Sequence, residues 1–353
     1  MNELTERFWP FIKILALPYL AIMFVLLFPM EYYLQAPGGL AEVEAIIQVE
    51  EGYDQEGTIS STYIMSIKRP TFFQFMAGYF SDYATSGELS GSLADYTNEE
   101  INRISYLDKY TSVNAAVIVA YEKASEIDDS IVIDYTESIM VYGKADYLSH
   151  YDAIEFGDEF VQMEGDGGRI VSDYENIGTY TQNKQTYPFT FRNEEDGTYT
   201  VVLEKDAESD KFGLTLKRYF LVNKENTSPT YQESDSNIGG PSGGLLQTLA
   251  IYNMLTPEDI TKGRMVAGTG TINYDGSVGY IGGVKQKIVT AYLNDVDVFF
   301  IPNLDDDYYY DNYQEALRVC EELNIDPEGW LIPVAHVDEA IDFLDDENGG
   351  MTS

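Results

Sequence analysis

Residues 237–246 read Asn237-Ile238-Gly239-Gly240-Pro241-Ser242-Gly243-Gly244-Leu245-Leu246 and place one serine among four glycines and a proline. Apolar residues follow at the spacing of a buried helix face: Leu245, Leu246, Leu249, Ile251, Tyr252 and Leu255. Ser242 is therefore predicted at the start of a helix, where free backbone N–H groups and the helix dipole stabilise an anion beside its hydroxyl. The pattern indicates a nucleophilic serine, and the alternative is a loop that ends in a helix cap.

Residues 267–287 contain a second informative segment. Ala267-Gly268-Thr269-Gly270-Thr271-Ile272 reads as a strand, Asp275-Gly276 as a turn, and residues 278–281 as a further strand. The pair Gly282-Gly283 then opens a helix that carries Lys287. The segment therefore predicts a lysine in the first turns of a helix, behind a strand and a turn.

Together the two segments resemble the proteolytic domain of the Lon family, in which a serine in G-P-S-x-G is activated by a lysine four residues past the second glycine of a G-G motif. Lys287 is the fourth residue after Gly283. The resemblance continues through residues 255–257, the strand at 298–302 and the last helix near 339–341. It covers about the last third of the chain, and the most similar group is the membrane-anchored, PDZ-containing Lon-like proteases of bacteria.

The resemblance implies peptide hydrolysis by a Ser-Lys dyad. Ser242 would be the nucleophile and Lys287 the general base, and the hydroxyl of Thr269 would orient the lysine amine. Backbone N–H groups around Gly240 and Gly243 are the expected oxyanion hole. A free lysine has a pKa of about 10.4, so burial has to lower the pKa of Lys287 before the amine can accept a proton near neutrality.

Two positions depart from the family pattern, and two other functions compete with proteolysis. Gly243 stands where alanine usually follows the serine, which is a small change, and Gly239 stands where many members carry an acid, so a possible support of the dyad is missing. Residues 240–244 also fit the G-x-S-x-G motif of α/β-hydrolase esterases, with His336 downstream, but the residues before the serine are too polar for the strand that this fold needs. The other alternative is a catalytically inactive PDZ scaffold.

Composition limits the remaining function classes. The 353 residues are 44% hydrophobic, enough for about two to three domains with packed cores. A formal net charge of −39 excludes a general nucleic-acid binder, because no basic stripe is present to neutralise phosphates. Cys320 is the only cysteine, so no intramolecular disulfide forms, and its helical neighbours predict a small buried side chain.

We expect no cofactor and no metal. The sequence has two histidines and no C-x-x-C or H-E-x-x-H spacing. The acidic clusters at residues 305–307 and 345–347 lack the spacing of an EF-hand loop and are predicted to be solvated surface.

The first residues predict a membrane anchor. Residues 8–30 are predicted to be a transmembrane helix, because they are almost wholly apolar and about long enough to span hydrocarbon. Positive charges precede this segment and negative charges follow it: Arg7 and Lys13, then Glu31, Glu42 and Glu44. By the positive-inside rule, residues 1–7 would be a cytoplasmic tail and the catalytic domain would be extracytoplasmic, in a single-pass protein of the cell membrane. A cleaved signal peptide is disfavoured because no clear A-x-A site follows.

The rest of the chain is predicted to form two interleaved domains. Residues 31–125 are the first part of the Lon-like domain, with strands near 45–49 and 58–68, and a helix from Thr97, which forms a capping box with Glu100. An aromatic stripe at residues 72–80 is interpreted as core packing in preference to membrane contact. Residues 223–348 complete the catalytic domain, after a polar linker at 224–236 that is expected to act as a hinge.

Residues 126–222 resemble an inserted PDZ-like domain. Phe156-Gly157-Asp158-Glu159-Phe160-Val161 is similar to the L-x-x-G-D-x-I motif of bacterial PDZ domains, and residues 212–214 are similar to their closing strand. Such a fold binds an extended peptide along a sheet edge. Lys144 and Arg169 are candidates for contact with a bound carboxylate, but both are expected to be solvated charges.

The predicted fold is therefore α+β, a Lon-type proteolytic domain with an inserted PDZ-like domain and one N-terminal transmembrane helix. No G-x-x-x-x-G-K-[ST] motif occurs in the sequence, so no ATPase is expected. The predicted function is an ATP-independent endopeptidase whose partners are peptides or exposed protein segments and the membrane, with oligomerisation left open and no nucleic acid bound.

Overall fold

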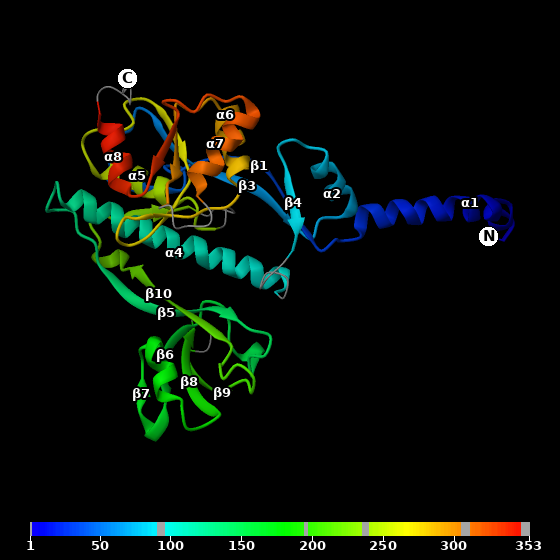
Figure 1. Cartoon of the computed structure of the whole chain (residues 1–353), viewed down its shortest axis with the longest axis horizontal. Helices are drawn as coiled ribbons and strands as arrows, with labels where there is room; N and C mark the ends of the chain where they lie inside the picture. The colour runs from blue at the N-terminus through cyan, green and yellow to red at the C-terminus, as the bar shows by residue number, and fades with distance from the viewer. Residues whose placement is uncertain (1, 90–95, 194–196, 235–239, 305–310, 347–353) are drawn as a thin grey trace.

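The structure is a computed structural model that describes residues 2–89, 96–193, 197–234, 240–304 and 311–346. It contains two bodies on opposite sides of the long helix α4 (Asn98–Ser125), with the helix α1 (Asn2–Leu27) projecting from one of them (Figure 1). The upper body in Figure 1 holds the start of the chain after α1 as well as its last helix, and the lower body is a separate antiparallel sheet.

The upper body is built on a six-stranded sheet in the order β16-β15-β12-β3-β1-β4. Its strands are β1 (Tyr32–Glu42), β3 (Thr58–Lys68), β4 (Thr85–Glu88), β12 (Met265–Gly268), β15 (Val298–Pro302) and β16 (Leu331–Val334). The strands β3, β12, β15 and β16 are parallel, whereas β1 pairs antiparallel with both β3 and β4. The β3–β12 pair joins parts of the chain before and after residues 126–222 into one sheet.

Helices cover both faces of this sheet, and the strand sequences show why. Side chains of β15 alternate between two cores: Phe300 packs with α4, α5 (Gly244–Leu255) and α8 (Val337–Asp345), while Phe299 and Ile301 pack with α6 (Val284–Leu293) and α7 (Asn312–Leu323). A strand that is buried on both faces needs a continuous apolar run, which Val298–Pro302 provides. The predicted strands at 58–68 and 298–302 are confirmed.

Helix α4 begins at the predicted capping box. The side chain of Thr97 accepts from the Glu100 backbone N–H, and Glu100 accepts from the backbone N–H of Thr97. Residues 111–121 of α4 are buried without interruption, because the helix packs against α5 on one side and against β10 of the lower body on the other. This helix therefore connects the two bodies.

The lower body is an antiparallel sheet in the order β10-β5-β6-β8-β9, with β7 paired to β6. Its strands are β5 (Tyr135–Lys144), β6 (Glu159–Glu164), β7 (Ile170–Val171), β8 (Thr186–Asn193), β9 (Gly197–Glu204) and β10 (Leu214–Val222). It has its own apolar core, which includes Phe160, Phe189 and Phe191. Within the described part of residues 126–222 the helical segments are all short 3₁₀ turns, at Tyr151–Ala153, Asp166–Gly168 and Tyr174–Tyr180. Residues 126–222 therefore form a separate sheet module, but these elements do not establish that the module is a PDZ domain.

The expected transmembrane helix is not found. Residues 8–30 fall on α1 and the chain just after it, and no helix in the described part of the chain is both long and apolar enough to span a membrane. The aromatic stripe on α2 (Phe72–Tyr79) was expected to pack in a core, and this is wrong: no residue of α2 is buried, and Tyr79 and Phe80 of the stripe are 66% and 77% exposed.

Two further expectations differ from the structure. The polar linker contains a strand, β11 (Tyr231–Glu233), which pairs with β2 (Ile47–Val49), so this part of the expected hinge is anchored to the upper body. Lys144 was expected to be solvated and is buried. Arg169 is exposed, as expected, and lies over the ring of Tyr180 at 4.4 Å. Cys320 is buried, as predicted.

Candidate active site

Ser242 lies in a turn directly before α5, two residues ahead of the first helical residue, Gly244. The turn starts at Gly240, whose φ of +87° is in the region that favours glycine. Residues 237–239 lie outside the described residues, so the position of Gly239 is not described. The prediction of a serine at a helix start, after a glycine-rich turn, is confirmed.

The carbonyl oxygen of Ser242 is held from the sheet side. It accepts hydrogen bonds from the Gly270 backbone N–H at 2.9 Å and from Thr269 Oγ1 at 3.0 Å. These bonds explain why residues 267–272 do not form the single strand that was predicted. The chain leaves β12 at Gly268 to contact the serine turn, and it resumes as β13 (Thr271–Ile272), which pairs with β14 (Val278–Gly279).

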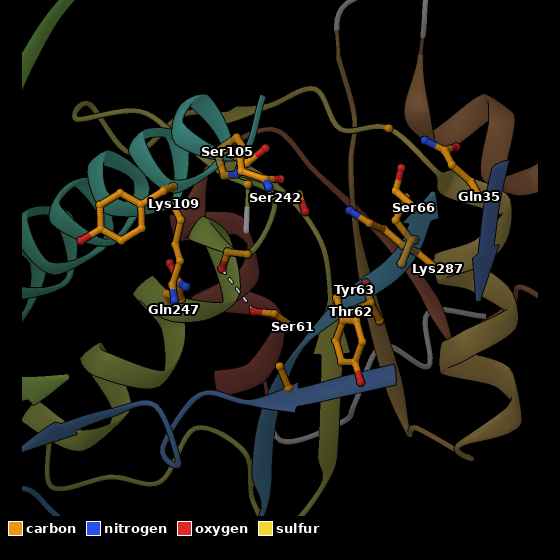
Figure 2. A pocket seen from close by; sticks show the side chains of 18 of the residues that line it. Gln35, Ser61, Thr62, Tyr63, Ser66, Ser105, Lys109, Ser242, Gln247 and Lys287 are labelled. Atoms are coloured by element: carbon orange, nitrogen blue, oxygen red, sulfur yellow. Dashed lines mark hydrogen bonds between the residues drawn. The ribbon is translucent and has the colours of Figure 1, made fainter. Parts of the chain in front are cut away.

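Helix α4 holds the other side of the turn. Ser112 Oγ donates to the Pro241 carbonyl oxygen at 3.0 Å, and the Gly240 N–H donates to the Ser105 carbonyl oxygen at 3.1 Å. On β3, Ser61 Oγ donates to the Gly243 carbonyl oxygen at 3.3 Å, as the dashed line in Figure 2 shows. No local pattern marks these three serines, because their contacts depend on how α4 and β3 dock against the turn.

Lys287 is the other predicted catalytic residue, and it lies in the first turn of α6. The helix begins after Gly283, whose φ is +71° and where an added Cβ would lie 2.8 Å from Ile64 Cδ1, so only glycine fits without displacement. Lys287 is 3% exposed, and its Nζ donates to Thr269 Oγ1 at 2.8 Å. Burial lowers its pKa to about 7, because few partners compensate the loss of water around the ammonium.

Thr269 therefore contacts both predicted catalytic segments. Its hydroxyl accepts from Lys287 Nζ and donates to the Ser242 carbonyl oxygen. Thr269 is fully buried, and its own backbone N–H donates to the Phe300 carbonyl oxygen at 3.0 Å, so β15 fixes its position. The hydrogen bond that the family resemblance implied between Thr269 and the lysine amine is present.

Ser242 and Lys287 line the same cavity, which has a volume of about 1150 Å³. Figure 2 shows their side chains on facing sides of this cavity, with the amine of Lys287 directed inward. The cavity is bounded by β3, the first turns of α4 and the turn at residues 240–243. Among the described hydrogen bonds none joins Ser242 to Lys287, a looseness that is common in catalytic sites without substrate.

The two backbone N–H groups expected in the oxyanion hole differ in whether they already have a hydrogen-bond acceptor. The N–H of Gly240 already donates to Ser105, so Gly240 is not the free donor that was expected. The N–H of Gly243 has no backbone acceptor within the described residues and lies at the N-cap of α5, where the helix dipole favours an anion.

His336 is not near the serine. It caps α8, where its Nδ1 accepts from the Asp338 N–H at 3.3 Å and its Nε2 lies 2.8 Å from the Asp275 carbonyl oxygen, and it is absent from the cavity lining. The geometry therefore gives no support to the esterase alternative.

The structure offers no obvious metal site in the part of the chain that it describes, where no group of three or more His, Cys, Asp or Glu side chains is placed to hold an ion. Of the two acidic clusters, residues 305–307 and 347 lie outside the described residues.

Comparison with known proteins points to one family. Residues 234–339 match the Lon protease (S16) C-terminal proteolytic domain. The chain is 30% identical over 115 residues to the Lon protease of Ureaplasma parvum serovar 3, which is 30% of this chain and 13% of that protein. It is 31% identical over 140 residues to the Lon protease of Metamycoplasma arthritidis, covering 39% and 15%, and 39% identical over 79 residues to that of Malacoplasma penetrans, covering 22% and 10%.

Residues 234–339 are therefore similar to the proteolytic domain of Lon proteases, which are serine endopeptidases. This range includes Ser242, Thr269 and Lys287. The matched region spans only 10% to 15% of these three relatives, so the likeness concerns the proteolytic domain and not the whole of those proteins.

Proposed function

We propose that this chain is an ATP-independent endopeptidase that cleaves extended peptides or exposed protein segments with Ser242 as nucleophile and Lys287 as general base. The proposal rests on one observation: Lys287 is buried, has a pKa of about 7, and faces Ser242, which lies in a turn, across the same cavity. At neutral pH about half of such lysines are neutral and can accept a proton. The similarity of residues 234–339 to the proteolytic domain of Lon proteases supports the proposal.

The reaction follows from this geometry. Lys287 Nζ takes the proton of Ser242 Oγ while the oxygen bonds to the peptide carbonyl carbon, and the Gly243 N–H stabilises the oxyanion. The C–N bond then breaks, and the lysine ammonium gives its proton to the departing amine. Water attacks the acyl-enzyme, gives a proton to Lys287, and Ser242 recovers its own when the acid product leaves. Thr269 keeps the amine directed toward the cavity throughout.

Ser242→Ala tests this proposal against an inactive scaffold. Cleavage of a mixture of unstructured peptides by the wild-type protein should disappear in the variant. Ser209→Ala is the matched control, because Ser209 is exposed in the lower body. His336→Ala should cleave at the wild-type rate, since its ring caps α8. A wild-type protein that cleaves nothing would favour the scaffold, and activity lost in His336→Ala but kept in Ser242→Ala would remove the dyad.

We also propose that the lower body selects substrates. It contributes no residue to the cavity lining, and β9 lies at the edge of its sheet, where an extended peptide can add as a further strand. A proline at Thr200, in the middle of β9, would remove a donor from this edge. The variant should raise KM for a protein substrate and leave cleavage of a short peptide unchanged, and an equal loss on both would show instead that the module supports the catalytic fold.

Membrane attachment and an extracytoplasmic position are proposed from the sequence and from apolar exposure. The described side chains of α1 include Phe11, Leu17 and Leu20 at more than half exposure, and α2 adds exposed aromatic rings beside it. Replacing these three residues of α1 by aspartate should release the protein from lipid vesicles in flotation. External protease should digest the rest of the chain in intact cells, and protection there would place the protein inside the cell.

A further inference from the structure

Three consecutive carbonyl oxygens of the serine turn, at residues 241–243, are each held by a hydroxyl group from a different element. The hydrogen bonds run from Ser112 Oγ to Pro241 at 3.0 Å, from Thr269 Oγ1 to Ser242 at 3.0 Å, and from Ser61 Oγ to Gly243 at 3.3 Å. A backbone N–H group also donates to each of these oxygens, in the same order from Gly244, Gly270 and Gln247. The direction of every carbonyl in the turn is therefore fixed by two donors.

These carbonyl directions determine where the neighbouring N–H groups point, because the C=O and the N–H of a trans peptide point in opposite directions. The bond from Ser112 to the Pro241 carbonyl turns the N–H of Ser242 away from α4. In the same way, the bonds from residues 269–270 to the Ser242 carbonyl turn the N–H of Gly243 away from that segment. Neither N–H has a backbone acceptor within the described residues, and both residues line the cavity. These two N–H groups are therefore placed to donate to an oxyanion beside the nucleophile.

The two glycines after the nucleophile make room for the serines of β3 and α4. A Cβ at Gly243 would lie 3.0 Å from Ser61 Oγ and 3.3 Å from Ser61 Cβ. A Cβ at Gly244 would lie 3.0 Å from Ser112 Oγ and 2.8 Å from Ile272 Cγ2. Gly243 stands where the Lon family usually carries alanine, so this departure coincides with the close approach of a hydroxyl that an alanine methyl would obstruct (Figure 2).

Both hydroxyls are mounted on well-supported elements outside residues 234–339, the part of the chain that is similar to Lon proteases. Ser61 lies on β3 where this strand is paired on both sides, with Ala41 of β1 and with Gly268 of β12. Ser112 is 7% exposed on α4, which packs against α5 and β10. Side chains on paired strands and packed helices hold a site more precisely than side chains on loops.

We propose that Ser61 and Ser112 are positioning residues of the oxyanion hole, which hold the serine turn so that the N–H groups of Ser242 and Gly243 face the carbonyl oxygen of a bound peptide. The inference rests on the proposed function, because it concerns the same reaction. As Ser242 Oγ bonds to the peptide carbon, the second electron pair of the C=O bond moves to the oxygen, and the two N–H groups stabilise this charge. Ser112 is not among the described residues of the cavity lining, so it acts through the turn.

Removal of one hydroxyl at a time tests the kinetic consequence. Ser112→Ala and Ser61→Ala should each lower kcat about tenfold and leave KM for a short peptide within about twofold, because the oxyanion forms only in the transition state. The midpoint of the pH profile should stay near 7, since the contact between Lys287 and Thr269 is intact. Wild-type kcat in both variants would overturn the inference and leave the proposed function standing.

Thr111→Val is the matched control for the loss of a buried hydroxyl. Thr111 adjoins Ser112, is also 7% exposed, and donates to carbonyl oxygens of its own helix, those of residues 107 and 108. Its kcat and KM should equal those of the wild type. A tenfold loss of kcat in this variant as well would show that any hydroxyl of α4 supports activity through the fold, and the specific role of Ser112 would be rejected.

An inhibitor that mimics the oxyanion separates positioning from a folding defect. A peptide aldehyde forms a tetrahedral hemiacetal with a serine hydroxyl, whereas the matching peptide alcohol binds without this bond. In Ser112→Ala and Ser61→Ala the affinity for the aldehyde should fall about tenfold, and the affinity for the alcohol should stay within about twofold. Equal losses for both ligands would mean that the hydroxyls shape the cavity, which contradicts the inference. A wild-type protein that neither cleaves peptides nor prefers the aldehyde would refute the proposed function and the inference with it.

Gly243→Ala tests the approach of Ser61 by a second route. The added methyl group should displace the Ser61 hydroxyl and lower kcat about as much as Ser61→Ala does. The double variant should be no slower than either single variant, because both changes remove the same contact. Losses that multiply in the double variant would show that the two residues act independently, and this would overturn the role of Ser61.

Discussion

Lys287 and Lys144 are both buried, at 3% and 5% exposure, but they lie in regions of different chemistry. Lys287, in the upper body, donates to one neutral hydroxyl, that of Thr269. Lys144, in the lower body, donates to the carbonyl oxygens of Tyr151 and Ile154 at 3.1 and 2.9 Å and lies 3.9 Å from the centre of the Tyr151 ring. The surroundings of Lys287 leave an ammonium poorly solvated, whereas those of Lys144 replace much of the water that the ammonium loses on burial.

The pKa values follow these surroundings. Burial lowers the pKa of both lysines. At Lys144 four carboxylates oppose the effect: Glu155, Glu100, Asp152 and Asp158. At Lys287 burial acts without an opposing charge in the described surroundings, and the pKa falls to about 7. Burial alone therefore does not make a lysine a base. A base also needs the absence of carboxylates and of strong acceptors around its amine.

The largest effect is expected when Lys287 is replaced by methionine, which fills a similar volume without the amine. Activity should fall by about a thousandfold or more, because no other described group near Ser242 can take its proton. The folded protein should become more stable by a few kcal/mol at pH 7, since the unfolded chain holds a charged lysine that the fold has to desolvate. Thermal unfolding together with a peptide assay measures both effects. Lys285→Met serves as the control and should change neither.

Unchanged activity in Lys287→Met would reject Lys287 as the base, and a large loss of stability would show that the amine supports the fold.

The second prediction concerns pH. Because the base works only when neutral, kcat/KM should rise through one ionisation near pH 7 and fall about tenfold for each pH unit below it. The unfolding free energy should also rise from about pH 7 to 10.5, since in this window the unfolded lysine is protonated and the folded one is not. A pH series of activity and of denaturant unfolding checks both slopes. A flat activity profile between pH 5 and 8 would contradict the assignment.

The third prediction sharpens the role of the hydroxyl between the two segments. Thr269→Val keeps the shape of the side chain but removes the acceptor of Lys287 Nζ and the donor to the Ser242 carbonyl oxygen. We expect kcat to fall about tenfold with little change in KM, because the amine loses its orientation while the cavity stays intact. The midpoint of the pH profile should shift as well, which a purely structural defect would not cause. Thr269→Ser should restore most of the activity.

The sequence was sufficient for the parts of this site that depend on local spacing. The glycine turn before α5, the Gly283 start of α6 and the position of Lys287 could be predicted because each is set by neighbours within a few residues. The parallel strand Val298–Pro302 was equally clear, since five consecutive buried residues need no distant partner to be recognised.

Features that depend on distant packing could not be predicted. The hydrogen bonds from α4 to the serine turn join residues more than a hundred positions apart, so no local pattern announces that Gly240 is already paired with Ser105. The same reason applies to Lys144, which stands at a strand end and looks like a solvated charge. Only the return of the chain at Tyr151 and Phe156 covers it.

The last prediction has the smallest effect on activity and concerns Lys144 itself. Lys144→Met removes the donor to one buried and one partly buried carbonyl oxygen, so the protein should lose about 1–3 kcal/mol of stability, the opposite sign from Lys287→Met. Cleavage of a short peptide should stay within about twofold of wild type, and the midpoint of its pH profile should stay near 7, because Lys144 lines no part of the cavity. Lys144→Arg should recover less than half of the lost stability, since a planar guanidinium does not fit a site shaped for a compact ammonium. A shifted pH midpoint in Lys144→Met would mean that the lower body acts on the electrostatics of the dyad, and the two lysines would then not be independent.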